Sequence, residues 1–486
     1  MQDVDVLVVG AGPTGLAVAC GLLTNGVKVR VVDKANGPAT TSRANFLHAR
    51  GSEVLDRLGA LDDMPARSVR AMKITTYLGD KPIMQLRFGD PEMRTAAPPM
   101  VISQAAVEAS LRDRVAQLGG EIDWGTALVD LRQDDASVAA VVGGDELKAS
   151  WVVGCDGAAS TTRHLAGIGF PGVKLSERFL LADVRLDWNL DRSGTTGWIH
   201  PEGMIGAMPM PDDTGRLWRI IAYDPGQPAD KPTESEILAR LDRILPERTG
   251  RPVSITDAVW LSMFSVHRRL ADTYRRGRVL LVGDAAHTHA PFGGQGMLTG
   301  LGDAENLAWK LALVVRGKSD ARLLDSYEQE RRPLATEVLR GTGAVTKINI
   351  AQGRLGRFIR DRLVVPLLNV RGVQRWVTYR TSQLWVSYRH GPLAERSLPF
   401  PKPRPGDRVP GLRGADLNGR WALLSTDDSL RAVATAHLGD GVAALPQKRS
   451  SDAFLVRPDG HLGWRGRRPN ALDRWLNRAL ATGSVR

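Results

Sequence analysis

The sequence predicts an α/β fold in three parts, and three observations support this prediction. At the N-terminus a strand, a glycine-rich turn, a helix to about Thr24 and a second strand follow one another (Val4–Val9, Gly10–Gly15, Val27–Val32). From about Gly172 to His267 the chain has period-two patches, such as Leu180–Leu186 and Leu217–Ala222, which are typical of a mainly antiparallel sheet. At Pro399–Pro410 the composition changes abruptly to Pro, Lys, Arg and Gly, which indicates a linker before a small α/β module.

The remaining elements follow from the same patterns of apolar residues. In the first part we expect helices at Gln104–Leu118, Met297–Val315 and Leu323–Leu339, further helices divided by Pro and Gly over Arg360–Tyr388, and strands at Trp151–Gly154 and Arg278–Val282. The middle part has a helical pattern at Glu234–Ile244, and the last module has strands at Trp421–Ser425, Ala453–Val456 and His461–Trp464 and a helix at Ala471–Leu480. These patterns predict one discontinuous domain, residues 1–172 and 268–398, a middle domain, residues 173–267, and a final domain, residues 399–486.

Length and composition limit the class of protein. The 486 residues exceed what a single core usually serves, and 43% hydrophobic with 24% charged residues is ordinary for a globular chain. No apolar run reaches the 18 or so residues that span a bilayer, and no basic stretch or cleavage site precedes the first strand. Two cysteines, Cys20 and Cys155, exclude a disulfide framework. We therefore expect a cytoplasmic protein with no membrane partner.

The positive charge does not by itself indicate a nucleic-acid partner. The formal net charge is +12 and the pI about 10.0, but the arginines are dispersed. No zinc-finger spacing, RNP-like aromatic pattern or lysine block accompanies them. We expect no nucleic-acid binding, although the positive field favours anionic ligands such as dinucleotides.

The motif Gly10-Ala11-Gly12-Pro13-Thr14-Gly15 predicts a Rossmann-like dinucleotide site, because a strand precedes it and a helix follows. Gly10 makes the tight turn, Gly12 lets the backbone approach a pyrophosphate, and Gly15 lets the helix pack on the sheet. The N–H groups at the helix N-terminus favour the phosphates. Asp33 ends the second strand, where a carboxylate accepts hydrogen bonds from ribose hydroxyls and repels a 2′-phosphate.

A second string, Gly167-Ile168-Gly169-Phe170-Pro171-Gly172, also fits G-x-G-x-x-G. No strand precedes it, and Pro171 with Gly172 would stop a helix there. We expect a loop, and hence no separate dinucleotide fold for a nicotinamide cofactor.

The segment Gly277–His287, continuing through Pro291 to Gly296, predicts a site for a flat polar ring with a polyol chain. A strand delivers Asp284, whose carboxylate can accept hydrogen bonds from hydroxyls. The glycine-rich loop lets backbone N–H groups approach a planar ring, and the helix beginning near Met297 directs its positive end there. A reduced flavin, which carries negative charge at N1 and C2=O, suits such an end.

Other chemistries have weaker support. His287 and His289 form an H-x-H pair without a third or fourth ligand at credible spacing, so we expect no metal. No G-x-S-x-G elbow is present for a nucleophilic serine. Asp156-Gly157, with Arg163 after it, follows the strand Trp151–Gly154. An acid and a glycine at this place fit an ordinary turn as well as they fit a binding site.

In this order and spacing, Gly10–Gly15, Asp156-Gly157 and Gly283-Asp284 resemble the FAD-dependent aromatic hydroxylases built like p-hydroxybenzoate hydroxylase, over the whole chain. The further segments Leu47–Arg50, Leu181–Val184, Tyr327–Pro333 and Leu455–His461 look like polyketide hydroxylases, pentachlorophenol-monooxygenase-like enzymes and rifampicin monooxygenases. The resemblance implies a Rossmann-like FAD-binding domain, an α+β substrate-binding domain and a thioredoxin-like C-terminal domain.

The resemblance also implies the residues that contact FAD. The ADP half would lie on Gly10, Gly12, Pro13, Thr14, Gly15, Asp33 and Lys34. The pyrophosphate and ribityl would contact Arg43, Gln104, Arg112 and Asp284, and Asp156 with Gly157 would serve both FAD and the nicotinamide donor. The isoalloxazine would lie against Pro291, Gly293, Gly294, Gln295, Gly296, Met297 and Leu298.

The chain departs from the family pattern at several positions. Asp33 replaces the usual Glu, Leu298 stands where Asn is common, and Gly302 stands where Gln is common. Any flavin contact at Leu298 must therefore come from its backbone. The C-terminal module contains no cysteine, so it has no thiol redox chemistry and we expect a structural or assembly role.

The implied reaction is hydroxylation of a bulky phenolic or polyketide-type substrate. FAD would be reduced by NADPH or NADH as a transient donor, and O2 would form a flavin C4a-hydroperoxide that must be kept from water. Candidate pocket residues are Trp198, Met208, Met210, Tyr223, Phe264, Pro291 and Phe292. No catalytic base can be named; a phenolate-forming side chain could be Tyr223, His200 or none.

Several alternatives stay open on the same fold. They are a Baeyer–Villiger oxygenase, an antibiotic-inactivating monooxygenase, an oxidase, and a non-enzymatic protein that binds FAD or another ligand. A flavin halogenase is disfavoured because no W-x-W-x-I-P motif occurs. The chain could be a monomer or a homodimer.

Overall fold

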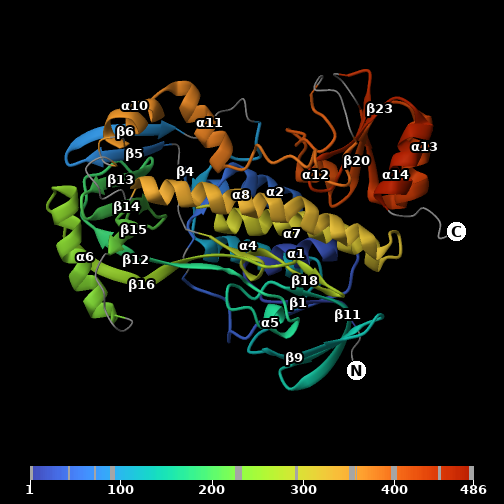
Figure 1. Cartoon of the computed structure of the whole chain (residues 1–486), viewed down its shortest axis with the longest axis horizontal. Coiled ribbons are helices and arrows are strands. Elements are labelled where there is room, and N and C mark those ends of the chain that lie inside the picture. Colours follow the sequence, from blue (N-terminus) through green and yellow to red (C-terminus); the bar gives the residue numbers. More distant parts are fainter. Residues whose placement is uncertain are drawn as a thin grey trace.

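The computed structural model describes residues 4–41, 44–70, 73–87, 94–224, 232–289, 294–349, 356, 358, 360–395, 402–446 and 450–480. In these residues two large sheets form the body of the molecule, and we call the second one, formed mainly by residues 172–270, the middle sheet. A smaller C-terminal module lies at the opposite end of the molecule from the middle sheet (Figure 1). No helix in the described ranges is long and apolar enough to cross a membrane.

The first large sheet has the strand order β17-β18-β11-β1-β2-β8, with the hairpin β9–β10 attached to β11. Its central strands pair in parallel, and Val6–Val9 of β1 are buried, as expected for a sheet covered on both faces. Its strands are β1 Val4–Val9, β2 Val29–Val32, β8 Ile122–Asp123, β9 Leu128–Gln133, β10 Val138–Val142, β11 Asp145–Gly154, β17 Arg275–Arg276 and β18 Val279–Leu281.

Helices α1 (Pro13–Thr24), α4 (Gln104–Gln117) and α7 (Gly296–Val315) lie over this sheet, with α1 packed against both others (Figure 1). Pro13 begins α1, where a missing N–H costs nothing. Ser103 caps α4 by accepting a hydrogen bond from the N–H of Ala106 at 3.2 Å. The predicted strand–turn–helix–strand and these helices are confirmed to within a few residues.

The second large sheet has the order β19-β16-β12-β15-β14-β13-β5-β6 and is antiparallel except at β13–β5. One prediction needs correction here. Strands β5 and β6, which we placed with residues 1–172, extend the middle sheet instead, and β16 continues past residue 267. The strands are β5 Lys73–Leu78, β6 Lys81–Arg87, β12 Gly172–Leu186, β13 Thr195–His200, β14 Gly203–Pro209, β15 Leu217–Asp224, β16 Ile255–Leu270 and β19 His287–Thr288.

Helix α6 (Glu234–Thr249) covers one face of the middle sheet. A capping box formed by Thr233 and Glu236 starts it, and Gly250 ends it in the left-handed conformation. Its apolar residues Ile237, Leu241, Ile244 and Leu245 pack on alternate residues of β12, β14 and β15. The helix is on the outer side in Figure 1, so the opposite face of the sheet looks toward the body of the molecule.

Shorter elements connect the two sheets. A three-stranded sheet is formed by β3 (Phe46–Leu47), β7 (Met100–Val101) and β4 (Val69–Arg70). The remaining helices of this part are α2 Ala49–Leu58, α3 Met64–Arg67, α5 Thr161–Leu165, the 3-10 helices Gly283–Ala285 and Ala321–Leu324, α8 Asp325–Asn349, a π-helical turn Arg360–Val364, α10 Val365–Leu368 and α11 Arg371–Thr381. Helix α8 is ten residues longer at its C-terminal end than predicted, and Pro333 lies in its first half.

The C-terminal module contains a four-stranded sheet in the order β21-β20-β22-β23. Strands β20 and β21 are parallel, whereas β22 is antiparallel to both β20 and β23. Its elements are α12 Gly414–Leu417, β20 Trp421–Leu424, α13 Asp428–Leu438, β21 Val442–Leu445, β22 Ala453–Val456, β23 Leu462–Gly466 and α14 Pro469–Ala479. The module shares its core with the rest of the chain, because Trp309 of α7 packs with Trp421 and Trp475.

A buried ion network joins the β22–β23 hairpin to helices α7 and α8. Arg457 donates hydrogen bonds to both oxygens of Glu330, at 2.7 and 2.8 Å, and also binds Asp459. Lys310 donates to the same Glu330 at 2.8 Å. Burial raises the pKa of Glu330, but the charges of Arg457 and Lys310 more than reverse this and lower it to about 2. Burial also lowers the pKa of Lys310 to about 8.

The network continues onto α2, through Arg50. Its guanidinium donates to Glu53 at 2.8 Å, to Glu305 of α7 at 3.2 Å and to the backbone oxygen of Asp459 at 2.9 Å. Arg408 of the module also binds Glu53. The hairpin of the C-terminal module therefore holds α2, α7 and α8 in fixed relation.

Candidate active site

The glycine-rich turn has the geometry that a pyrophosphate requires. Gly10 has φ of +104°, and a Cβ there would lie 2.5 Å from the carbonyl oxygen of Cys155. A Cβ at Gly15 would collide with the carbonyl oxygen of Gly10, so this glycine brings helix and strand together. A Cβ at Gly12 would meet no protein atom within 4 Å. The turn thus leaves open space at the N-terminus of α1, where the free N–H groups lie.

Thr14, which lies within this motif in the first turn of α1, has a packing role. Its side chain fills the space that a Cβ at Gly283 or Gly300 would need. It therefore links the first motif to the Gly283-Asp284 turn and to α7.

Asp33 and α4 form the next part of the site. The Asp33 carboxylate accepts hydrogen bonds from the backbone N–H groups of Ala11 and Ala35, at 2.7 and 2.8 Å. Gln104 donates to Glu108 at 2.8 Å. Burial, with a smaller effect of the Asp33 charge, raises the pKa of Glu108, while Gln104 and Arg112 act in the opposite direction. Lys34 is exposed beside Asp33.

Arg112 of α4 carries a buried nitrogen, Nη1, without a hydrogen-bond partner among the described residues. A buried guanidinium nitrogen left without a partner is costly. A phosphate oxygen would satisfy it, which fits the predicted FAD contact of Arg112.

Asp156 organises the start of α5. Its carboxylate accepts hydrogen bonds from the Ser160 hydroxyl at 2.5 Å and from the backbone N–H of Thr162 at 2.9 Å. Arg163 of the same helix donates to the backbone oxygen of Ala285 at 3.0 Å. The second motif is therefore connected directly to the turn that carries Asp284, and Gly157 makes its bend with φ of +78°.

Asp284 is the exposed residue of a buried segment. Residues 279–283 and 285–288 are buried, whereas the Asp284 side chain is exposed. Gly283, with φ of +63°, turns the chain so that this carboxylate points out. Among the described residues no donor binds the Asp284 carboxylate, so it is available to the hydroxyls of a ligand.

The N-terminus of α7 follows, with Gln295 as its N-cap and Gly296 as its first residue. The side chains of Met297 and Leu298 are buried, Leu298 toward Gly51 of α2, so only their backbone can face a ligand. A Cβ at Gly294 would lie 3.3 Å from Phe46. Four predicted contact residues, Arg43, Pro291, Phe292 and Gly293, lie outside the described residues.

A charged cluster under this turn was not predicted. Asp303 of α7 is fully buried, and its carboxylate binds His287 and Arg331, each at 2.6 Å. Arg331 also donates to the backbone oxygen of Thr299 at 2.9 Å. Burial raises the pKa of Asp303, but Arg331 and His287 outweigh it and the pKa lies below its ordinary value. The cluster fixes the 283–288 turn on α7, and its sequence signal is an acid at an apolar position of a helix.

His287, the first histidine of the H-x-H pair, is therefore bound to Asp303 and has a structural role. In the part of the chain that the structure describes, no group of three or more His, Cys, Asp or Glu side chains could hold a metal ion.

The middle sheet presents an apolar face away from α6. Phe179, Tyr223 and Phe264 lie side by side on it, with ring centroids 5.6 and 5.7 Å from Phe179. Met208 follows Ala207 of the α6 core and so points to this opposite face. Three predicted pocket residues, Met208, Tyr223 and Phe264, thus share one face.

Two neighbouring strands of this face have paired positions without side chains, and we call the strip between them the trough. Gly197 of β13 and Gly206 of β14 are direct cross-strand partners. A Cβ at Gly206 would meet nothing within 4 Å, and one at Gly197 would meet its nearest atom at 3.6 Å. Two paired positions without side chains leave a flat surface that suits a planar ring system.

The structure places three other candidates elsewhere. Trp198 is 1% exposed, packs in the core under α6 and stacks on Trp188 at 5.1 Å, so its assignment to the pocket was wrong. Strand alternation gives the reason, since Trp198 follows Gly197 and faces the other way. Met210 lies with Val101 of the three-stranded sheet. His200 ends β13, where its Nδ1 accepts a hydrogen bond from the N–H of Glu202 at 3.3 Å.

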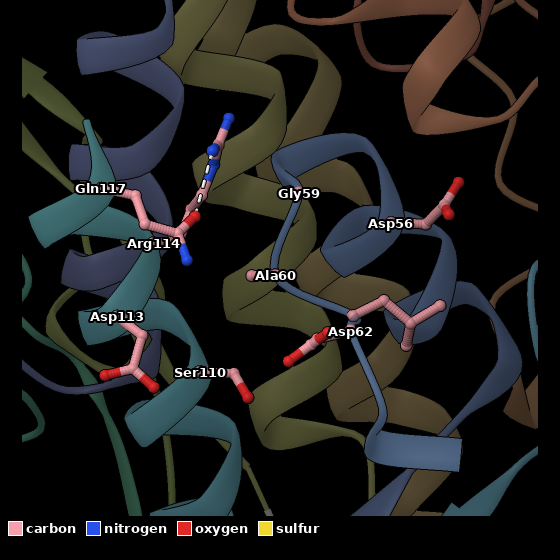
Figure 2. Close-up of a pocket in the computed structure, with 9 residues that line it drawn as sticks. Asp56, Gly59, Ala60, Asp62, Ser110, Asp113, Arg114 and Gln117 are labelled. Carbon is pink, nitrogen blue, oxygen red and sulfur yellow. Dashed lines mark hydrogen bonds between the residues drawn. The ribbon is translucent and has the colours of Figure 1, made fainter. Parts of the chain in front are cut away.

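A polar pocket of about 310 Å³ lies between the end of α2 and α4 (Figure 2). Asp56, Asp62 and Asp113 line it, and Arg114 donates to the backbone oxygen of Leu58 at 3.1 Å. None of its lining residues is a predicted FAD contact, so we assign it no part in the site.

Known proteins match the chain along almost its full length. The sequence profile of the FAD binding domain family matches residues 3–342. The chain is 34% identical over 473 residues to a rifampicin monooxygenase from Streptomyces venezuelae, covering 95% of each chain. It is 33% identical over 519 residues to the 6-methylpretetramide 4-monooxygenase of Streptomyces rimosus, covering 96% of this chain and 91% of that one.

The fold agrees with these matches. The structure superposes on the anhydrotetracycline hydroxylase from Streptomyces rimosus with a TM-score of 0.80 and 31% identity, over 99% of each chain. The matched segment contains all three motifs of the site. The chain therefore belongs to the FAD binding domain family and is an FAD-dependent aromatic monooxygenase.

Proposed function

We propose that FAD lies along the line of residues from Gly12 to the N-terminus of α7. Gly12 would leave room for the pyrophosphate, Arg112 would bind a phosphate oxygen, and Asp284 would accept hydrogen bonds from the ribityl chain. Open space at Gly12, an unpartnered buried nitrogen on Arg112 and an exposed carboxylate on Asp284 support this assignment. These three features suit a ligand with a phosphate and a polyol.

The bound flavin, once reduced by NADPH or NADH, supplies the chemistry that transfers an oxygen atom from O2 to an aromatic ring. The chain's own residues would hold the substrate and exclude water. Phe179, Tyr223 and Phe264 form an apolar cluster on this face, and an apolar lining of this kind would keep water from the reacting flavin. Asp183 and Arg219, farther along the same face, are paired with each other at 2.6 Å and so cancel their charges.

We infer that the substrate is a polycyclic aromatic compound, which would lie flat in the trough formed by Gly197 and Gly206. The observation that carries this inference is the open space above paired glycines on an apolar face. Proteins that match the chain are named rifampicin monooxygenase, 6-methylpretetramide 4-monooxygenase and anhydrotetracycline monooxygenase, and a wide flat site would suit a substrate of that class.

Substitution of Gly206 tests this proposal. Gly206→Leu would fill the trough without a clash at Cβ, so the folded protein should retain FAD. We expect phenols with three or four fused rings to stimulate NAD(P)H oxidation in the wild type but no longer in Gly206→Leu, while single-ring phenols keep their effect. Gly441→Leu, whose Cβ also meets nothing within 4 Å, is the control. Unchanged stimulation by the fused-ring phenols in Gly206→Leu would contradict the proposed position.

We also propose that the C-terminal module is a cysteine-free thioredoxin-like domain with a structural role. Its mixed four-stranded sheet with α13 and α14 supports the first part. The absence of cysteine from residues 399–486 and the buried network around Arg457 support the second part.

A further inference from the structure

The outer surface of α10 and α11 is unusually apolar. Six large apolar side chains, each between 43% and 62% exposed, occur in the stretch from residue 358, just before α10, to residue 379 of α11: Phe358, Leu363, Leu367, Val370, Trp376 and Tyr379. The segment lies at the periphery of the molecule, outside β5 and β6 (Figure 1). We call these six residues the α10–α11 face. Exposed apolar side chains concentrated in one segment in this way mark an interaction site more often than isolated ones do.

The inner side of the same helices is polar, which is the reverse of an ordinary surface helix. Asn369 donates to the backbone oxygen of Ile83 at 2.7 Å and accepts from the N–H of Gln85 at 3.1 Å. Thr378 donates to the backbone oxygen of Arg87 at 3.0 Å. These side chains satisfy the free edge of strand β6, so the helices are held by hydrogen bonds and their apolar residues are left outside.

Exposed arginines lie in the same stretch of chain as the α10–α11 face. Arg362 and Arg371 are exposed between the apolar side chains. Arg380 of the same segment pairs with Glu337 of the neighbouring α8 and so adds no net charge, whereas neither Arg362 nor Arg371 has an acidic partner among the described residues. A partner for this surface should therefore combine an apolar layer with negative charge.

We propose that the α10–α11 face docks on an anionic lipid surface. Trp and Tyr side chains suit the boundary between headgroups and acyl chains, and arginines attract anionic headgroups. A second copy related by a two-fold axis through the face would instead bring the arginines of both copies together. The contact is peripheral, since no described helix can span a membrane. This proposal departs from our expectation of no membrane partner, which was drawn from the lack of a spanning segment.

The proposal is independent of the substrate assignment and is tested on the FAD-loaded, full-length protein. The measurement is co-sedimentation with vesicles of phosphatidylcholine containing phosphatidylglycerol, with pure phosphatidylcholine vesicles for comparison. We expect binding to the anionic vesicles that weakens strongly between ionic strengths of roughly 0.05 and 0.5 M. Arg371→Gln should weaken it about fivefold, the effect of one basic residue near the surface.

Trp376→Ser with Leu367→Ser tests the apolar part of the contact, and the control is Val129→Ser. Val129 is 61% exposed on β9 of the other large sheet. The double variant should lose at least tenfold in vesicle affinity, whereas Val129→Ser should bind like the wild type. Circular dichroism and retained FAD would show that the variants fold. Equal binding of all variants, no binding at any salt concentration, or a dimer abolished by the double variant without vesicle binding would each overturn the proposal.

Discussion

Removal of Arg457 should destabilise the whole molecule and not only the C-terminal module. Arg457 is 1% exposed and donates two hydrogen bonds to Glu330 of α8, at 2.7 and 2.8 Å, besides its bond to Asp459. In Arg457→Met the side chain keeps a similar length, but Glu330 retains only Lys310 as a positive partner. Breaking a buried ion pair by removing one partner costs about 3–5 kcal/mol. We expect a loss of this size in the free energy of unfolding.

The assay is urea unfolding of the FAD-loaded protein, followed by tryptophan fluorescence and by flavin release. Trp309 and Trp421, with ring centroids 5.1 Å apart, report on the core shared by α7 and the module. The control is Arg478→Met, because Arg478 pairs with Glu395 at 3.2 Å through a side chain that is 58% exposed. An exposed pair of this kind contributes about 0–1 kcal/mol.

Two results would refute this reasoning. One is a loss below about 1 kcal/mol in Arg457→Met, comparable to the control. The other is separate unfolding of the module while FAD stays bound, since α7 belongs to both the site and the network. Adding Glu330→Gln to Arg457→Met should recover part of the loss, because it removes an uncompensated buried charge.

Three further predictions concern the cofactor and pH. Gly12→Val should fold, because a Cβ at this position meets no protein atom within 4 Å, but it should lose FAD, because the valine would occupy the space of the pyrophosphate. Gly441→Val, whose Cβ also meets no atom within 4 Å, should keep FAD. Equal flavin content of the two variants after gel filtration would contradict this prediction. Asp284→Ala should weaken FAD retention by about 1–3 kcal/mol in ultrafiltration, and unchanged retention would remove its ribityl role. Glu53 and Glu330 have pKa values of about 2 in the folded protein, against an ordinary value of 4.5. Each therefore contributes about 3 kcal/mol to the free energy of unfolding above pH 4.5, and this contribution is lost as the pH falls toward 2. Acid titration of Glu330→Gln should show a flatter loss of stability, and an unchanged profile would argue against this linkage.

The parts of the fold that the sequence predicted well are those whose physics is local. The turn Gly10–Gly15 is directly preceded by a strand and leads directly into a helix. A short stretch of sequence therefore contains everything that the prediction of a dinucleotide site needs. Strands β5 and β6 show the limit of such short stretches. We predicted no strands there, and only the assembled sheet shows that β5 pairs with β13, far along the chain.

The substrate face shows a second limit. Period-two alternation predicted a mainly antiparallel sheet in this part of the chain, but it does not say which of the two faces meets α6. The neighbouring residue Gly197 lies on the face that we assign to the substrate. Because glycine has no side chain, it adds nothing to the pattern of apolar residues that would mark this face in the sequence.

Buried charges were missed for a related reason. Arg50, Glu305 and Arg457 look like solvated residues in a linear pattern, because each finds its partner on a distant element. The Asp303 cluster is of the same kind. Their burial depends on the assembly of α2, α7 and the C-terminal hairpin, which no local window contains.

The origin of the oxygen atom in the product tests the central claim most directly. The FAD-loaded protein would be given NAD(P)H and a fused-ring phenol under oxygen-18 gas, and the product analysed by mass spectrometry. We expect one labelled oxygen atom per product molecule, no label from oxygen-18 water, and no product after FAD removal. Label from water, product formed without FAD, or NAD(P)H oxidation that yields only hydrogen peroxide with every phenol would contradict it.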